Sequence, residues 1–92
     1  MKDDALLKEF EEFLAGRGLR LTDQRRQIAR VFFEAEGHHS AEDIYHRVQQ
    51  QLSGIGTATV YRTMKLLNEA GLATGLNLGD GFARYESPAK RG

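Results

Sequence analysis

The segment TATVYRTMK, residues 57–65, contains the side chains best suited to contacting a partner molecule. If the segment is helical, a rotation of 100° per residue places Val60, Met64 and Leu67 on the inner side. The side chains that then point outward are Ala58, Tyr61, Arg62 and Lys65. An arginine can bond two acceptors of a guanine base, and an aromatic ring can pack on a thymine methyl group. These residue types at this spacing therefore suit the major groove of DNA.

Hydroxyl groups at the start of the same segment suit the DNA backbone instead. Thr57 and Thr59 can donate to phosphate oxygens, and they lie where the positive end of a helix dipole favours an anion. Ala58 between them is small, which lets the helix end approach closely. The alternative is a helix surface that meets only solvent.

In that alternative, the Tyr61 ring lies flat on the protein surface and Arg62 is neutralised by an acidic neighbour. Glu69 and Glu86 are the two candidates for that neighbour. Both interpretations of the helix remain open on residue pattern alone.

Composition limits the chain to one small domain. It has 92 residues, of which 40% are hydrophobic and 28% charged; a second domain would lack a core of its own. The absence of cysteine excludes a disulfide framework, a thiolate zinc finger, an iron–sulfur centre and a cysteine nucleophile. No apolar run approaches the roughly 18 to 20 residues that cross a bilayer, and the N-terminus is not a signal peptide. We therefore expect a soluble cytoplasmic protein without a membrane partner.

The formal net charge of zero conceals blocks of opposite sign. Residues 17–33 contain five arginines against one aspartate, whereas residues 1–16 contain two lysines against five acidic residues. A surface with such blocks can present one basic face, so neutrality does not exclude nucleic acid. The zero net charge does argue against a protein that binds polyanions tightly and without specificity.

Four helices and a hairpin are predicted along the chain. Apolar residues recur at three- and four-residue spacing in each helical segment. Thr22 is a good N-cap, and Ser40 with Asp43 forms an acidic variant of the capping box. Asp-Gly between two short apolar runs is the strongest short hairpin signal. The predicted elements are helices over 3–16, 22–37, 40–52 and 57–70, and strands on either side of residues 79–81.

This order of elements describes an α+β winged helix-turn-helix. It consists of a three-helix core, an extra N-terminal helix and a two-stranded β wing, all within residues 1–86. The short link SGIGT between the third and fourth helices suits the turn of that motif. Residues 87–92 are expected to form a frayed tail or the start of a linker. An ordinary small α+β domain without a nucleic-acid role shares the same pattern.

The sequence also resembles a known family. The stretches GLRLTDQRRQI, HHSAEDIY, IGTATVYRTMKLLNEAGL and GDGFARYE occur in an order similar to that of the N-terminal domain of the ferric uptake regulator (Fur) family. The resemblance covers residues 17–86. It implies a winged helix that binds double-stranded operator DNA as part of a dimeric transcription regulator, such as a repressor, whose affinity is set by metal bound in a C-terminal domain.

The resemblance assigns roles to individual residues. Tyr61 and Arg62 match the positions where the family's recognition helix touches bases, and Arg20 matches a basic residue that reaches an adjacent minor groove. Gln24 and Arg25 belong to T-D-Q-R, which replaces the family's usual T-P-Q-R and adds a negative charge near the phosphate path. The expected DNA-binding set is Arg20, Gln24, Arg25, Thr57, Thr59, Tyr61, Arg62 and Lys65.

Metal binding is expected to be incomplete in this chain. His38 and Glu86 match two ligands that the family contributes from this domain, but two ligands do not make a site for Fe(II), Mn(II) or Zn(II). The chain ends at SPAKRG, about where the family's first metal-binding His cluster begins. We therefore expect either an excised domain or a naturally short version. No cofactor is expected in the chain itself, and a homodimer only with the C-terminal domain.

The same residue pattern leaves other functions to consider. A winged helix can serve as a protein-interaction module, because fold does not determine function; an apolar outer face on residues 57–70 would favour this. Zinc, manganese and peroxide sensors share the same domain as iron sensors. An enzyme is not expected, because the sequence has no phosphate-binding glycine loop, no H-E-x-x-H and no G-x-S-x-G motif.

Overall fold

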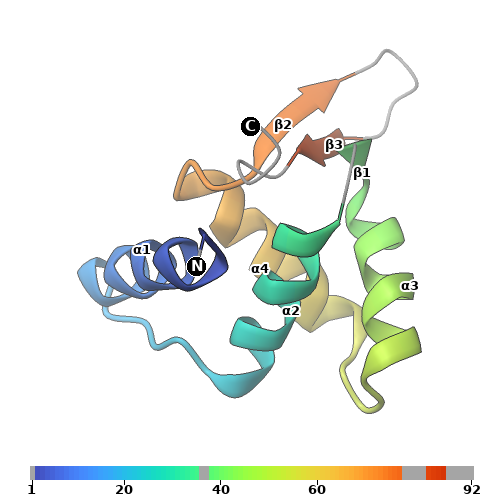
Figure 1. Cartoon of the computed structure of the whole chain (residues 1–92), viewed down its shortest axis with the longest axis horizontal. Helices are drawn as coiled ribbons and strands as arrows, with labels where there is room; N and C mark the ends of the chain where they lie inside the picture. The colour runs from blue at the N-terminus through green and yellow to red at the C-terminus, as the bar shows by residue number, and fades with distance from the viewer. Residues whose placement is uncertain (1, 36–37, 78–82, 87–92) are drawn as a thin grey trace.

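The computed structural model describes the backbone of residues 2–35, 38–77 and 83–86, and the side chains of residues 4–35 and 39–73. Within these ranges the chain forms a bundle of helices with a small sheet at one end, at the top of Figure 1. The helices are α1 (Lys2–Gly16), α2 (Asp23–Glu34), α3 (Ala41–Gln51) and α4 (Thr57–Glu69). The strands are β1 (His38–His39), β2 (Thr74–Asn77) and β3 (Ala83–Glu86).

Two helices begin with the caps that the sequence predicts. The Thr22 hydroxyl accepts a hydrogen bond from the Arg25 backbone N–H at 3.2 Å, which starts α2. At the start of α3, the Ser40 hydroxyl accepts from the Asp43 N–H at 3.1 Å, and the Asp43 carboxylate accepts from the Ser40 N–H at 3.2 Å. This reciprocal pair satisfies two backbone donors that the helix itself leaves free.

Two helices end at a glycine with a left-handed backbone. Gly18 has φ of 73° and Gly71 has φ of 78°, a region that favours glycine. The N–H groups of Leu19 and Leu72 then bond the carbonyls of Leu14 and Leu67, at 2.8 Å and 2.9 Å. Both ends are therefore Schellman motifs, which stop α1 and α4 sharply. By contrast, α2 ends at Ala35, and the predicted stop at Gly37 lies outside the described residues.

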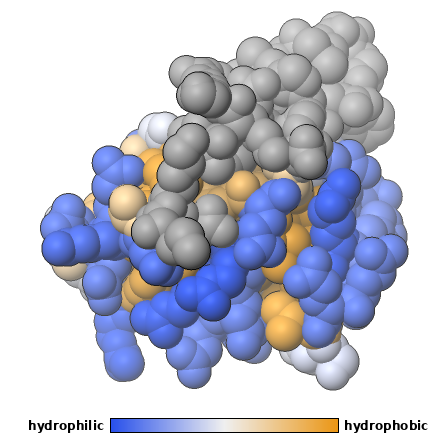
Figure 2. Space-filling view, viewed as in Figure 1, coloured by the Kyte–Doolittle hydropathy of each residue, from blue (hydrophilic) through white to orange (hydrophobic). Residues whose placement is uncertain are grey.

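The core lies where α2, α3 and α4 meet, and α1 packs against α2. Its largest fully buried side chains are Phe10, Phe32, Phe33, Leu14, Ile28, Ile44, Met64, Leu67, Val48 and Val60. The inner face predicted for α4 is confirmed. On the face shown in Figure 2, hydrophobic residues are visible mainly in gaps between hydrophilic ones.

The sheet contains one more strand than the sequence predicts. The strand order is β1-β3-β2, with both pairs antiparallel. The additional strand is β1, whose two residues are too few to show a period and whose partner strand lies more than 40 positions away. It is β1 that joins the hairpin strands to the helices, since α3 follows directly after Ser40. The turn predicted at residues 79–81 lies outside the described residues, as does the tail at 87–92.

No helix in the described part of the chain combines the length and apolarity needed to cross a membrane.

Candidate nucleic-acid interface

The outer face of α4 is polar and exposed. Tyr61 is 43% exposed, and Arg62 and Lys65 are also exposed, whereas Val60 and Met64 on the opposite side have no exposed surface. The helix phase expected from the sequence is therefore correct. An exposed tyrosine beside two cations is a poor surface for an apolar protein partner and a suitable one for a polyanion.

Arg62 does not have the acidic partner that the solvent-facing alternative requires at Glu69. The Glu69 carboxylate instead accepts a hydrogen bond from the guanidinium of Arg17. Within the described ranges, Arg62 makes no hydrogen bond or ion pair. The side chain of Glu86, the other candidate, lies outside the described ones, so among the described side chains Arg62 is unpaired.

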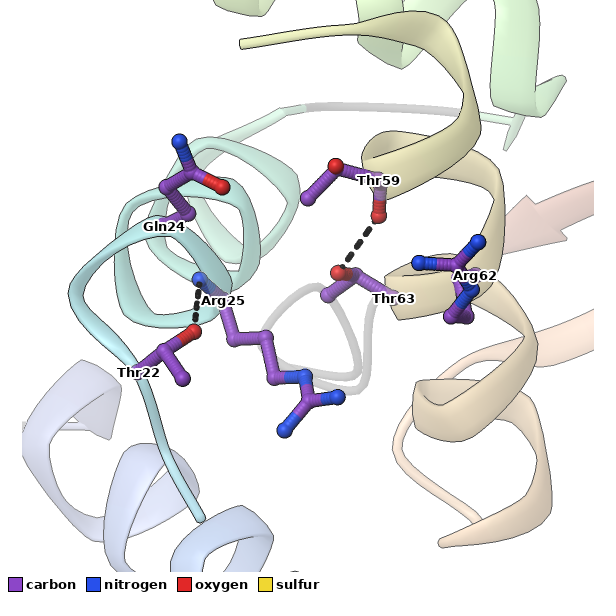
Figure 3. Close-up of a pocket in the computed structure, with 6 residues that line it drawn as sticks. All are labelled: Thr22, Gln24, Arg25, Thr59, Arg62 and Thr63. Atoms are coloured by element: carbon purple, nitrogen blue, oxygen red, sulfur yellow. Dashed lines mark hydrogen bonds between the residues drawn. The ribbon is translucent and has the colours of Figure 1, made fainter. Parts of the chain in front are cut away.

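A polar cleft lies between the start of α2 and the first two turns of α4 (Figure 3). Its volume is about 190 Å³. The side chain of Arg25 extends from α2 into the space between the helices, and Arg62 lies across from it on α4. The lining residues are Thr22, Gln24, Arg25, Thr59, Arg62 and Thr63, which include two arginines and no acidic residue. Such a cleft attracts an anion.

The α4 side of the cleft is held by a threonine that the sequence analysis did not select. Thr63 is 1% exposed, and its hydroxyl donates to the Thr59 carbonyl at 2.7 Å. A serine or threonine in a helix commonly bonds the carbonyl one turn earlier, and this habit is the signal that could have found it. The bond satisfies Thr63 within the helix and leaves the Thr59 hydroxyl toward the cleft (Figure 3).

The first turn of α4 itself is uncapped. Gly56 occupies the N-cap position and supplies no side-chain acceptor, and no acidic residue stands in the first turn. The N–H groups there, including that of the exposed Thr57, therefore have no side-chain partner within the described chain. Free N–H groups at a helix start favour phosphate.

Arg25 also holds the segment between α1 and α2. One of its guanidinium nitrogens donates to the backbone carbonyl of Arg20 at 2.6 Å, and the Thr22 N–H bonds the same carbonyl at 3.1 Å. Because a guanidinium has five N–H donors, Arg25 can make this contact and still bind a phosphate. The structure thus adds a positioning contact that the T-D-Q-R pattern did not reveal.

Arg20 itself lies apart from the cleft. It is exposed and lines a separate groove with Glu11, Ala15, Leu19 and Leu21. Four of the expected DNA-binding residues line the cleft: Gln24, Arg25, Thr59 and Arg62. Three more lie on α4 outside the cleft, namely Thr57, Tyr61 and Lys65, and Arg20 lies in the separate groove. The negative charge of Asp23 is partly offset, because its carboxylate lies 3.5 Å from the Arg26 guanidinium.

The two candidate metal ligands lie opposite each other in the sheet. The register pairs His38 with Glu86, and His39 with Tyr85, so both histidines belong to β1. His39 is half-buried in β1, so it is not a fully solvent-exposed residue. Among the described residues, no group of three or more histidine, cysteine or acidic side chains gathers to hold a metal.

The amino-acid sequence of the chain matches those of known proteins. The family model described as "Ferric uptake regulator family" matches residues 16–91. The chain belongs to this family. It is 41% identical over 80 residues to the ferric uptake regulation protein of Rhizobium leguminosarum bv. viciae, an alignment that covers 87% of the chain and 56% of that relative. The chain therefore spans little more than half the length of this Fur-family relative.

Solved structures of Fur-family regulators share the fold. A manganese uptake regulator superposes with a TM-score of 0.72 at 41% identity, covering 85% of this chain and 57% of that one. The Helicobacter pylori ferric uptake regulator gives a TM-score of 0.83 over 98% of this chain and 60% of that one, and at 24% identity it supports the fold alone. These neighbours are winged-helix regulators named for different metals, so family membership does not select iron over manganese.

Proposed function

We propose that this chain binds double-stranded DNA and forms the DNA-binding part of a metal-responsive transcriptional regulator. The observation that carries the proposal is the acid-free cleft between α2 and α4, which adjoins the exposed Tyr61, Arg62 and Lys65. Within the cleft, Arg25 suits a backbone phosphate, whereas Arg62 on the exposed face of α4 suits base edges. Membership of the Fur family supports the same conclusion.

In this proposal α4 enters the major groove with its first turn against the backbone. Arg62 bonds a guanine and Tyr61 packs on a thymine methyl group. The groups that contact phosphates are Gln24, Arg25, Thr57, Thr59 and Lys65. Arg20, in its separate position, reaches an adjacent minor groove. The strands β2 and β3 form the wing, which contacts the backbone beside the recognition helix.

The metal-responsive part of the proposal rests on β1 and β3. Residues directly opposite in an antiparallel pair lie on one face of the sheet, which suits His38 and Glu86 as two ligands of one ion. Imidazole with carboxylate suits Fe(II), Mn(II) or Zn(II), and each needs further ligands. We propose that these come from a C-terminal domain, which also forms the homodimer. The ion would link β1 and β3 to that domain.

The test compares two arginines that differ in position and share the same charge. Arg62→Ala should weaken binding to a preferred duplex by about 1–3 kcal/mol and flatten the preference at one base position. Arg30→Ala is the control, because Arg30 is an exposed arginine of α2 that lines a different groove. Fluorescence anisotropy with a duplex selected by this chain from a randomised pool gives both affinities. Equal losses on selected and random DNA would exclude base contact by Arg62.

A further inference from the structure

A side-chain contact joins the ends of α1 and α4, which are far apart in sequence. Arg17 follows the last residue of α1, and its guanidinium donates to the carboxylate of Glu69, the last residue of α4. The same guanidinium lies over the Phe13 ring, 4.6 Å from its centroid. The contact spans 52 positions of the chain. It ties the segment after α1 directly to the recognition helix.

Helix electrostatics favour this arrangement. A carboxylate at a helix C-terminus is unfavourable, because the carbonyl groups there already carry partial negative charge. Arg17 neutralises Glu69 and lies at the C-terminal end of α1, where a cation is favoured. Stacking on Phe13 limits the directions that the guanidinium can take.

The contact is too exposed to matter much for stability. The side chain of Arg17 is 49% exposed and that of Glu69 is 32% exposed. Ion pairs at this exposure contribute little to folding, because water screens the attraction and two long side chains lose freedom. The main effect of this contact is therefore on the position of the chain segment that follows α1.

The segment that it places contains Arg20. Gly18 turns the chain out of α1 immediately after Arg17, and Arg20 follows two residues later. From the other side, Arg25 of α2 holds the Arg20 carbonyl at 2.6 Å. The segment is thus fixed at one end to α4 and at the other to α2.

We propose that Arg17 and Glu69 form a positioning pair that sets the distance between Arg20 and the base-contacting residues of α4. The role rests on the proposed DNA binding. It determines specificity, because two contacts at a fixed separation accept DNA sites of only one spacing. Neither residue of the pair contacts DNA in this role.

Two single variants with opposite charge changes test the pair. Glu69→Gln removes a negative charge, so electrostatics alone predicts tighter binding to all DNA. Arg17→Gln removes a positive charge, so electrostatics alone predicts weaker binding. A positioning role predicts that both relax the spacing requirement equally, and that the double variant is no more relaxed than either single one. Glu34→Gln is the matched control, because Glu34 is the exposed last residue of α2.

The measurement uses the 92-residue chain at low ionic strength. One probe is a duplex selected by the unaltered chain from a randomised pool, and the other has one base pair inserted between the segments that the chain protects from cleavage. The inserted base pair should weaken DNA binding by the unaltered chain, and by the Glu34→Gln control, about tenfold. It should weaken DNA binding by Arg17→Gln or by Glu69→Gln less than about threefold. The melting temperature should fall by less than about 5 °C, as expected for an exposed ion pair.

The possible outcomes separate the two proposals. If Glu69→Gln keeps the tenfold insertion penalty and binds both duplexes more tightly, the pair contributes charge only and the positioning role is wrong. If the unaltered chain shows no preference among duplexes, the proposed DNA-binding function fails, and the role of the pair fails with it.

Discussion

The helices α3 and α4 are close in length and pack against the same core, yet they begin in opposite ways. In α3, the Ser40–Asp43 capping box closes the first turn, which also contains Glu42. In α4, Gly56 supplies no cap and the first turn contains no acidic residue. At the start of α3, side chains accept from two N–H groups and add negative charge, whereas the N–H groups at the start of α4 have no side-chain cap and lie near two arginines.

This difference agrees with the proposed function, in which α4 binds DNA and α3 supports it. A buried face is common to both, so burial alone does not identify the interface. An uncapped and acid-free helix start loses some intrinsic stability, because its donors lack partners in the free protein. The loss is recovered when an anion binds there. The contrast predicts how the two helices respond to salt, truncation and capping.

The largest expected effect is that of salt on DNA binding. If the whole proposed interface neutralises about five phosphates, log affinity should fall against log salt with a slope of about −4 to −5. Raising monovalent salt from about 50 to about 200 mM then weakens binding about 500-fold. Anisotropy titrations measure the slope. A slope near zero would exclude phosphate contact by the cationic side chains of the interface.

The same titration examines metal control. The proposed ligands from this chain, His38 and Glu86, are too few for a site, so Fe(II), Mn(II), Zn(II) or a chelator should leave its DNA affinity unchanged. A tight, dimeric and metal-dependent complex, detected by sedimentation, would show that residues 1–92 already contain a complete switch.

Truncation of buried side chains should destabilise both helices alike. Met64→Ala in α4 and Ile44→Ala in α3 should each lower the free energy of unfolding by about 2–5 kcal/mol, because both side chains are fully buried. Tyr61→Ala should change stability by less than about 0.5 kcal/mol and weaken DNA binding. Urea unfolding measures the first effect and anisotropy the second. If Tyr61→Ala is as destabilising as Met64→Ala, Tyr61 belongs to the core.

Removing the cap of α3 should affect folding only. Ser40→Ala eliminates the acceptor of the Asp43 N–H bond and should cost about 1 kcal/mol of stability. In a domain of this size the melting temperature then falls by about 4–8 °C. DNA affinity, measured well below the melting temperature, should not change. A parallel loss of affinity would place the start of α3 in the interface.

A small effect is expected from adding a cap to α4. Gly56 has ordinary φ and ψ of −81° and 162°, and an added Cβ meets no atom within 4 Å. Gly56→Asp should therefore stabilise the fold by a few tenths of a kcal/mol and weaken DNA binding about threefold. Gly56→Ser gives the same cap without the charge. If both variants bind DNA as the unaltered protein does, the free N–H groups of α4 contact no phosphate.

Local sequence determined most of the helical framework. Thr22 and Ser40 act as caps, and Gly18 and Gly71 end helices, because each forms hydrogen bonds within about five residues. The outward position of Tyr61 follows from helical periodicity, which is also local. These features, and the family resemblance that the same segments carry, were available before any packing was known.

Tertiary structure decided what the functional side chains meet. Only the packing of α2 against α4 brings Arg25 and Arg62 to one cleft, and only the fold pairs Arg17 with Glu69 and His38 with Glu86. Each of these contacts joins positions more than 35 residues apart. No local hydrogen-bond pattern or periodicity encodes which distant neighbour a polar side chain will have, because that choice is made when the buried faces of the helices pack together.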